Sequence, residues 1–331
     1  MTGGDVTVIV PVWNGRILLE RLLCGLRAQT EPPAEVLVVD DGSQDGSAEL
    51  AETMGARTIR MGVNSGFAKA VNRAIGEART PLLAIVNNDV ELAADWIEKL
   101  AGAIAPYVWF ATGRILQAAA RDRIDATYDV VCRGGTAWRV GHGCRDGPAF
   151  ANARPISCAP MTAALYRAEL FRSIGLLDER FESYLEDVDF GLRCAMAGYS
   201  GCYVPEALAW HQGSATLGRW HAATVRRTSR NQVLLIAKHY PARLLWRYSW
   251  PIVAAQVLWG LVALRHERGW SWLRGKWEGL CWFRQCRGRT DNPALSHWLT
   301  EGEREIRSVQ RESGRDLYWT LYFFLTAGGA K

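Results

Sequence analysis

The sequence of 331 residues lacks the patterns of several common protein classes. Its eight cysteines form no Cys-x-x-Cys pair, so we expect reduced thiols in the cytosol. No Gly-x-Gly-x-x-Gly follows the first strand-like run, which argues against a dinucleotide-dependent oxidoreductase. The first residues do not show the basic and apolar segments of a signal peptide, and the sequence contains no internal repeat. These absences favour a globular protein with an ordinary core.

Acidic residues are scarce in the last third of the sequence. Up to Gly213 there are 20 Lys and Arg and 26 Asp and Glu, whereas from Ser214 onward there are 19 and 8, a net charge of +11. Ten of the 15 tryptophans also follow Gly213. A basic, Trp-rich segment indicates contact with an anionic surface, either phospholipid or nucleic acid. Because no nucleic-acid-binding module is recognisable, we expect no nucleic-acid partner.

A 15-residue stretch in this last third, residues 250–264, carries no charge and lies between Arg247 and Arg265. As a helix it would be about 22 Å long, which is short of the roughly 30 Å of a bilayer core. We therefore expect peripheral membrane contact through residues 219–289, by helices that lie in the interface. The alternative is a helical subdomain that packs on the first domain.

Strand-like and helix-like segments alternate at the start of the sequence. β-branched runs predict buried strands, and apolar residues at spacings of three and four predict helices. The predicted strands are residues 6–12, 35–39, 57–61 and 81–86. The predicted helices are residues 16–29, 47–54 and 66–78. This alternation predicts an α/β fold, a parallel sheet with helices on both faces.

Polar residues directly follow three of these strands. Trp13–Asn14 follows the first, Asp40–Asp41 the second and Asn87–Asp89 the last. Because ligands of parallel sheets bind at the carboxyl ends of the strands, the sequence predicts a binding site there.

The sequence between residues 107 and 213 is less regular. Residues 107–150 are rich in Gly and Arg and are expected to form loops and short strands around a site. The other expected elements are a strand at 157–166, a helix at 167–174, a helix that begins near Glu186 and stops at Gly198, and extended segments at 203–205 and 207–211.

Each polar cluster also has a plain structural explanation. Asp40–Ser43 and Asn87–Asp89 are turn-prone sequences. Acids at residues 186–189 suit the first turn of a helix, where the macrodipole favours negative charge. His211 by itself is typical of a buried core histidine.

Taken together, the clusters suit a metal-assisted displacement at a sugar carbon. Asp89 and His211 would hold a divalent cation, whose coordination is completed by diphosphate oxygens and water. The cation would neutralise the departing diphosphate. A carboxylate on the opposite side would take the proton from the incoming hydroxyl.

Four segments carry a family resemblance. They are Val8–Asn14, Val38–Ser47, Asn64–Asn72 and, with the pattern Tyr-x-Glu-Asp-x-Asp-Phe-x-x-Arg, residues 181–193. In this order they resemble the opening strand, nucleotide-binding signature, Asn-x-Gly-Phe-Ala segment and acceptor-side motif of family 2 glycosyltransferases, inverting enzymes that use nucleotide-diphospho-sugars. The third segment is similar to the bacterial rhamnosyltransferase-like branch. The resemblance covers residues 6–214 and implies a GT-A (Rossmann-like), mostly parallel sheet flanked by helices, followed by a helical extension.

The resemblance also implies roles for individual residues. Asp187 would be the general base, and Asp89 and His211 the ligands of Mg²⁺ or Mn²⁺. Asp41 would accept a hydrogen bond from the nucleotide base. The other expected nucleotide-sugar-binding residues are Pro11, Trp13, Asn14, Asn64, Gly66, Lys69, Asn87 and Asn88. The residues expected at the acceptor or behind the base are Glu186, Asp189 and Arg193, of which Arg193 is expected to pair with an acid.

One position departs from the family pattern. The usual Asp-x-Asp is Asn87-Asn88-Asp89 here, which removes up to two negative charges beside the cation. We expect weaker metal affinity and a site that depends on His211 and the diphosphate of the donor.

The resulting functional hypothesis is an inverting transfer from a dTDP-, UDP- or GDP-sugar to a glycan or lipid-linked acceptor. The expected setting is bacterial cell-surface polysaccharide synthesis, in the cytoplasm at the inner face of the cell membrane. Residues 1–213 would form the catalytic domain, with a nucleotide-sugar half (1–106) and an acceptor half (107–213). Residues 214–331 would form the basic helical extension.

Two other functions are alternatives to this hypothesis. A nucleotidyltransferase on a similar sheet needs a glycine-rich basic loop after the first strand, and residues 12–16 are poor in glycine. A non-catalytic protein that binds nucleic acid or an anionic surface would use only the basic tail.

Overall fold

The computed structural model describes residues 1–213, 220–288 and 291–327, which group into two compact units. The sheet unit comprises Met1–Tyr128 and residues 141–213, and the helical unit comprises Asp129–Val140 and the described residues from 220 onward. Residues 129–140 thus group with the C-terminal helices, an association that the sequence patterns did not indicate. The outer ends of the predicted membrane segment, residues 219 and 289, lie outside the described residues.

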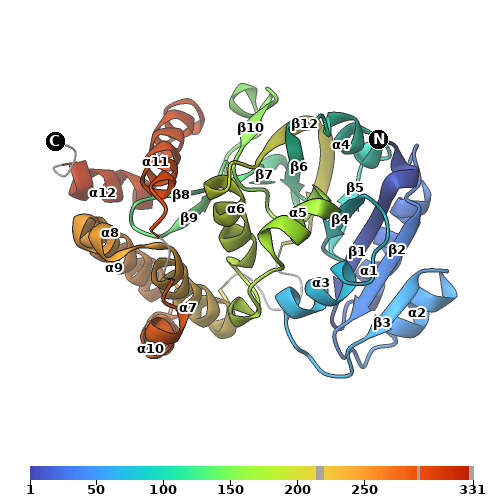
Figure 1. Ribbon diagram of the computed structural model, residues 1–331, viewed down its shortest axis with the longest axis horizontal. Coiled ribbons are helices and arrows are strands. Elements are labelled where there is room, and N and C mark those ends of the chain that lie inside the picture. The colour runs from blue at the N-terminus through green and yellow to red at the C-terminus, as the bar shows by residue number, and fades with distance from the viewer. Residues whose placement is uncertain (214–219, 289–290, 328–331) are drawn as a thin grey trace. The chain divides into compact units, whose positions relative to one another are not determined.

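The described part of the sheet unit contains one sheet of ten strands (Figure 1). They are β1 (Val6–Val12), β2 (Glu35–Asp40), β3 (Arg57–Arg60), β4 (Leu82–Val86), β5 (Val90–Leu92), β6 (Val108–Gln117), β7 (Ala120–Ala126), β10 (Arg154–Ile156), β11 (Ala163–Arg167) and β12 (Ser200–His211). Its helices are α1 (Arg16–Arg27), α2 (Ser47–Thr53), α3 (Phe67–Ile75), α4 (Trp96–Ala103), α5 (Ala168–Ile174) and α6 (Glu186–Met196), with 3-10 turns at Gly3–Asp5, Pro148–Phe150 and Glu179–Phe181. The elements predicted between residues 6 and 86 are confirmed, with ends that shift by at most three residues.

The sheet is parallel in its first half and mixed in its second. The main path runs β10-β12-β6-β11-β4-β1-β2-β3, while β5 pairs with β12 and β7 with β6. Strands β3, β2, β1 and β4 are parallel neighbours, as the alternation of strands and helices predicted. Strand β11 is antiparallel to both β4 and β6. The expectation of a mostly parallel sheet therefore holds for the nucleotide half only.

Alternating side chains of β1 explain the layers around the sheet. Val6, Val8, Val10 and Val12 point to one face and belong to a buried cluster with leucines of α1 and with Trp96 of α4. Helix α3 packs against β1 and β2. Burial of both faces is the reason that β1 is apolar at every position except Thr7.

The second half of the sheet corrects three predictions. Residues 107–150 contain a ten-residue central strand, β6, in addition to the expected loops and short strands. The extended segments expected at 203–205 and 207–211 form one strand, β12, with a register shift against β6 between Val204 and Leu208. The strand expected at 157–166 is limited to β11. Gly113 and Arg114 interrupt the apolar sequence of β6, so this strand was not predicted.

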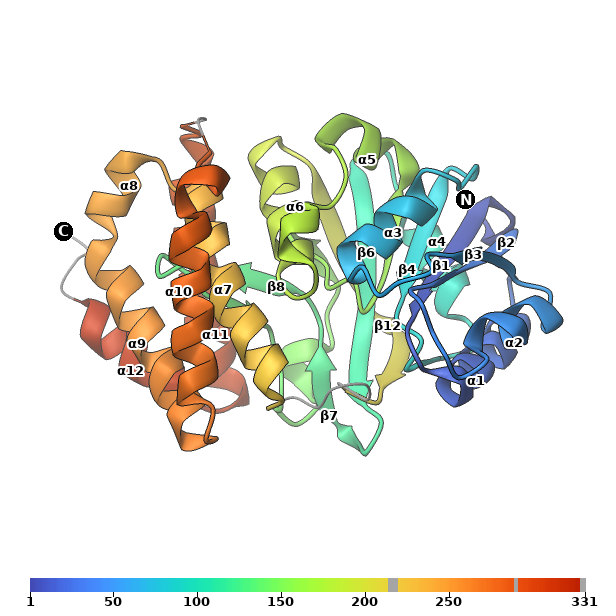
Figure 2. The ribbon, with the colours of Figure 1, turned by 90° about the horizontal axis from the view of Figure 1, so that it is seen from below.

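The helical unit consists, in its described part, of a two-stranded hairpin and six helices (Figure 2). The hairpin strands are β8 (Asp129–Val131) and β9 (Ala137–Arg139). The helices are α7 (Ala222–His239), α8 (Ala242–Arg247), α9 (Ser249–Arg265), α10 (Gly269–Cys286), α11 (Ala294–Ser313) and α12 (Leu317–Thr326). None of the helices within the described ranges is both long and apolar enough to cross a membrane.

A buried ion pair attaches the hairpin to the helices. Arg133 Nε donates to Glu303 Oε2 of α11 over 2.8 Å, and the Tyr322 hydroxyl of α12 donates to Glu303 Oε1 over 2.6 Å. A paired and hydrogen-bonded carboxylate avoids the cost of an isolated buried charge. This contact explains why a short segment in the middle of the sequence belongs to the C-terminal unit.

Two glycines allow α7 and α10 to pack closely. A Cβ added at Gly275 would lie 2.2 Å from the Arg226 carbonyl oxygen, and one at Gly279 would lie 2.7 Å from Cβ of Val233. Between these glycines, Lys276 is buried in the helical unit. Its ammonium group donates to the Ser229 carbonyl and to the side-chain oxygens of Gln232 and Gln256.

We predict that Lys276 makes stability rise with pH. Burial lowers the pKa of Lys276 from 10.5 to about 7. Between these values the unfolded chain holds a proton that the folded chain has released, so the free energy of unfolding increases by at most about 1.4 kcal/mol per pH unit. Chemical denaturation between pH 7 and 10 should show this slope in the unaltered chain. It should be reduced in Lys276→Met but not in Lys99→Met, and equal slopes in all three proteins would refute the assignment.

Candidate active site

The loops that follow β1 and β2 are joined through Asn14. Asn14 adopts a left-handed backbone conformation, with φ 49°. Its N–H donates to Ser43 Oγ over 2.9 Å, and its Oδ1 accepts from the Gln44 N–H over 2.8 Å. Asn14 therefore holds the two loops together at the carboxyl edge of the sheet. The half-buried Pro11 and Trp13 lie in the same part of the chain.

Asp41 fixes the loop in front of α3. Its Oδ1 accepts from the Ser65 N–H over 2.7 Å and its Oδ2 from the Gly66 N–H over 2.9 Å. Burial raises the pKa of Asp41, and the two backbone hydrogen bonds oppose that rise. Because each carboxylate oxygen has two lone pairs, Asp41 keeps acceptor capacity for a nucleotide base. Asn64 in this loop and Lys69 in the first turn of α3 are exposed.

The Asn87–Asp89 turn approaches the start of α1. Asn88 Nδ2 contacts the Gly15 carbonyl oxygen at 3.5 Å, and a Cβ at Gly15 would lie only 2.0 Å from this nitrogen. Glycine is thus required at position 15 so that Asn88 can reach across from β4 to the β1 end. This contact brings two of the predicted polar clusters together.

Strand register places His211 beside Asp89. His211 is the last residue of β12 and pairs with Val90 of β5, while the Gln212 N–H donates to the Asp89 carbonyl over 3.0 Å. Nε2 of His211 lies 3.2 Å from Asp89 Oδ1. The two predicted metal-binding residues, 122 positions apart in the sequence, are therefore in direct contact.

Asp125 of β7 is a third member of this cluster that sequence reasoning missed. Its Oδ2 accepts from His211 Nδ1 over 2.8 Å, and its backbone oxygen accepts from His142 Nδ1 over 2.7 Å. Burial lowers the pKa of His211, but the hydrogen bonds and charges of Asp125 and Asp89 outweigh this effect and raise it to about 9. The signal in the sequence was an acid between Ile124 and Ala126, which alternation places inside a strand.

The chemistry of this cluster fits a divalent cation. Asp89 offers an oxygen and His211 a nitrogen, and Asp125 holds the opposite ring nitrogen, as carboxylates commonly do for metal-binding histidines. Among the described residues no group of three or more His, Cys, Asp or Glu is placed to hold a metal. A cation held by Asp89 and His211 would need further oxygens from the donor and from water.

Asp187 is buried in the first turn of α6. Its Oδ1 accepts from the Val188 N–H over 2.8 Å, and its Oδ2 is 3.4 Å from the Met161 nitrogen. The segment that precedes the helix contains three residues with positive φ angles. They are Glu182 (59°), Tyr184 (74°) and Leu185 (67°). Such conformations are costly for residues other than glycine and concentrate at functional sites.

The segment before β11 connects Asp187 with the Asn87–Asp89 turn. Met161 donates to Asp187, and the carbonyl of the next residue, Thr162, accepts from the Asn87 N–H over 2.9 Å. Asp187, the predicted base, and the Asn87–Asp89 turn, predicted to bind the metal, therefore contact the adjacent residues Met161 and Thr162. The structure brings them to the same edge of the sheet.

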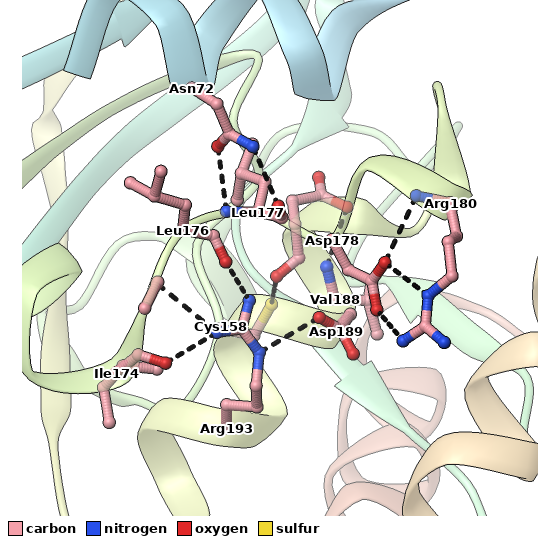
Figure 3. Close-up of polar contacts among 12 residues, drawn as sticks. Asn72, Cys158, Ile174, Leu176, Leu177, Asp178, Arg180, Val188, Asp189 and Arg193 are labelled. Atoms are coloured by element: carbon pink, nitrogen blue, oxygen red, sulfur yellow. Dashed lines mark hydrogen bonds and ion pairs between the residues drawn. The ribbon is translucent and has the colours of Figure 1, made fainter. Parts of the chain in front are cut away.

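Asp189 and Arg193 connect α6 to the segment that follows α5. Asp189 is fully buried and accepts from Arg193 Nε over 3.1 Å, which confirms the expected pairing of Arg193 with an acid. The same guanidinium donates to the carbonyls of Ile174 and Leu176 (Figure 3). Asp189 therefore stabilises the helix through Arg193. Glu186 is buried beside Asp187 in the same turn.

Comparison with known protein families decides the class of this site. The model of glycosyl transferase family 2 matches residues 7–175, more than half of the chain.

The chain belongs to glycosyl transferase family 2.

Characterised relatives agree with this membership. The N-acetylglucosaminyl-diphospho-decaprenol L-rhamnosyltransferase of Mycobacterium tuberculosis is 28% identical over 255 residues, covering 67% of this chain and 80% of the relative. The pre-mycofactocin glycosyltransferase of the same organism is 30% identical over 223 residues, covering 66% of this chain and 45% of the relative. The protein is a nucleotide-sugar glycosyltransferase of the rhamnosyltransferase-like type, as the sequence motifs predicted.

Solved structures of low identity share the fold of this glycosyltransferase. A mannosyltransferase from Pyrobaculum calidifontis, solved with GDP-Man and Mn²⁺, is 19% identical with a TM-score of 0.53, covering 98% of this chain and 85% of its own. TarS 1–349 of S. aureus, solved with UDP-GlcNAc, is 17% identical with a TM-score of 0.55, covering 98% and 92%. These likenesses support the GT-A assignment.

We predict that Asp125 determines the metal affinity of the glycosyltransferase. Asp125→Asn removes the charge that orients His211, so Mn²⁺ binding in the presence of a nucleoside diphosphate should weaken about 10- to 100-fold. Electron paramagnetic resonance of free Mn²⁺ measures this directly. Asp122→Asn is the matched control, because Asp122 lies on the same strand, is exposed and contacts Arg145. Equal Mn²⁺ affinity in both variants would refute the role of Asp125.

Proposed function

We propose that this protein catalyses an inverting sugar transfer from a nucleotide-diphospho-sugar to a hydroxyl group of a glycan or lipid-linked acceptor. The observation that carries the proposal is the connection of Asp187 and the Asn87–Asp89 turn through the adjacent residues Met161 and Thr162. A base and a diphosphate-binding turn at one edge suit a single displacement, in which the acceptor attacks as the diphosphate departs.

Asp187 is the proposed general base. Its carboxylate takes the proton of the acceptor hydroxyl as that oxygen bonds to the anomeric carbon, and the bond from this carbon to the diphosphate breaks. The contacts with Met161 and Val188 hold the carboxylate in one orientation before the acceptor arrives. Preorganisation of this kind lowers the barrier because little needs to be rearranged during the reaction.

Asp89 and His211 are the proposed ligands of Mg²⁺ or Mn²⁺. When bound, the cation would neutralise the charge that develops on the leaving diphosphate. Asn87 and Asn88 would face the ribose and phosphates as neutral groups, so that Asp89 carries the only carboxylate of the turn. Asp41, Trp13 and Pro11 would line the pocket for the nucleotide base.

The proposed acceptor is lipid-linked, and the proposed setting is polysaccharide synthesis at the inner face of the bacterial cell membrane. The mycobacterial rhamnosyltransferase that resembles this chain is named for a diphospho-decaprenol acceptor. The basic, Trp-rich helical unit supports the same setting, because such segments favour anionic membrane surfaces. We propose a dTDP-, UDP- or GDP-sugar as the donor.

Replacement of Asp187 by Asn is expected to separate chemistry from binding. Loss of the general base should lower sugar transfer by about 10²- to 10⁴-fold, whereas nucleotide binding should persist because Asp187 does not hold the donor. Transfer to acceptor is measured by mass spectrometry and nucleotide binding by calorimetry. Asp95→Asn, at a half-buried acid paired with Lys99, is the control. Substantial turnover in Asp187→Asn would exclude Asp187 as the base.

Metal dependence of donor binding provides a second test. The cognate nucleotide-sugar should raise the melting temperature of the protein more with Mn²⁺ than without it, because a cation at Asp89 and His211 would also bind the diphosphate of the donor. A panel of dTDP-, UDP- and GDP-sugars identifies the donor in the same experiment. In His211→Ala the Mn²⁺-dependent part of the stabilisation should disappear, and its persistence would refute the proposed metal site.

A further inference from the structure

The helical unit exposes rows of apolar side chains on three helices. The exposed residues recur mostly at intervals of three and four, so each row follows one side of its helix. On α9 they are Trp250, Val253, Val257, Leu261 and Leu264. On α10 they are Trp270, Leu273, Trp277, Leu280 and Trp282. On α12 they are Leu317, Leu321, Phe324 and Leu325.

These three helices are neighbours. Helix α9 packs against both α10 and α12. Trp250 Nε1 at the start of α9 donates to the Leu325 carbonyl of α12 over 2.8 Å, and Gly260 of α9 packs on the Trp272 ring of α10. The 14 exposed residues therefore lie on adjoining helices, and we call them the apolar face. Large exposed apolar patches on a protein surface mark interaction sites.

Basic residues accompany the apolar face. Arg247 precedes α9 and Arg265 ends it, while Arg274 and Arg284 lie among the tryptophans of α10, and all four are exposed. The sequence from residue 214 onward carries 19 basic and 8 acidic residues. Arginine and tryptophan together suit the boundary between water and lipid, where apolar side chains enter the bilayer edge and charged groups reach the headgroups.

We propose that the apolar face binds an anionic phospholipid bilayer, with α9, α10 and α12 lying in the plane of the interface. No helix in the described ranges is able to cross a membrane, which suits helices that lie on it. A second copy of the chain fits this face less well, because two such basic surfaces repel each other. The proposal deepens the membrane setting given under Proposed function and rests on the exposed side chains of the helical unit.

The proposed membrane contact extends beyond residues 219–289, the segment predicted from the sequence, to helix α12. Helix α12 contributes Phe324, which is 79% exposed, and three leucines, although it lies near the end of the chain. Its first turn is capped by Asp316, whose carboxylate accepts from the N–H groups of Tyr318 and Trp319. A capped helix holds these apolar residues in a fixed arrangement before any membrane is present.

Vesicle co-sedimentation of the full chain tests the proposal. We compare vesicles of phosphatidylcholine alone with vesicles that also contain phosphatidylglycerol. The unaltered protein should bind the anionic vesicles about tenfold more tightly, and added salt should weaken this binding. Trp270→Glu/Trp277→Glu and Val257→Glu/Leu261→Glu should each lower binding by about tenfold or more, because charge is placed in the apolar rows. Tyr107→Glu, an exposed aromatic of the sheet unit, should bind as the unaltered chain does.

Several outcomes would overturn the proposal. Equal sedimentation of the double variants and the unaltered chain would exclude the apolar face, and so would the absence of binding to anionic vesicles. A dimer of the unaltered chain that becomes monomeric in the double variants would assign the face to a second copy. Circular dichroism confirms that each variant is folded. Donor hydrolysis in the same samples separates the two proposals: retained hydrolysis without vesicle binding refutes this inference alone, and the reverse result refutes the proposed function alone.

Discussion

The hydrogen bonds of Met161 and Thr162 are the constraint on which the rest of the site depends. One residue holds the carboxylate of Asp187, and the next holds the turn that carries Asp89. The turn follows β4 and Asp187 lies in α6, about a hundred residues apart in the sequence. Because β11 is antiparallel to β4, the chain just before β11 passes the carboxyl end of β4, and a two-residue segment can contact both groups.

Several acidic groups of the site form hydrogen bonds or ion pairs with specific protein partners. Asp41 uses both oxygens to fix the loop at Ser65 and Gly66, and Asp189 is paired with Arg193. His211 lies between two carboxylates, so a charge at this buried position is compensated from both sides. Burial strengthens such contacts and makes an unpaired charge costly. The same principle joins the hairpin of the helical unit to α11 through Arg133 and Glu303.

Sequence reasoning succeeded where local pattern and physical requirement coincide. The strands β1, β2 and β4 are buried on both faces and therefore read as apolar runs, and the polar residues after them mark the carboxyl edge of a parallel sheet. It failed at β6, where Gly113 and Arg114 interrupt the apolar sequence, and at Asp125, where one acid gives no local signal of its partner. It also did not indicate that residues 129–140 belong with the C-terminal helices.

The sequence by itself determined the family, the parallel half of the sheet and the residue types of the site, because these depend on short-range patterns. Tertiary structure decided which groups meet. The pairing of β12 with β5 sets His211 against Asp89, and β7 adds Asp125. It also decided which apolar residues of the C-terminal helices stay exposed, because the Trp-rich sequence does not distinguish a buried side of a helix from an open one. Contacts between distant segments follow from strand register and helix packing, which the sequence specifies only through the complete fold.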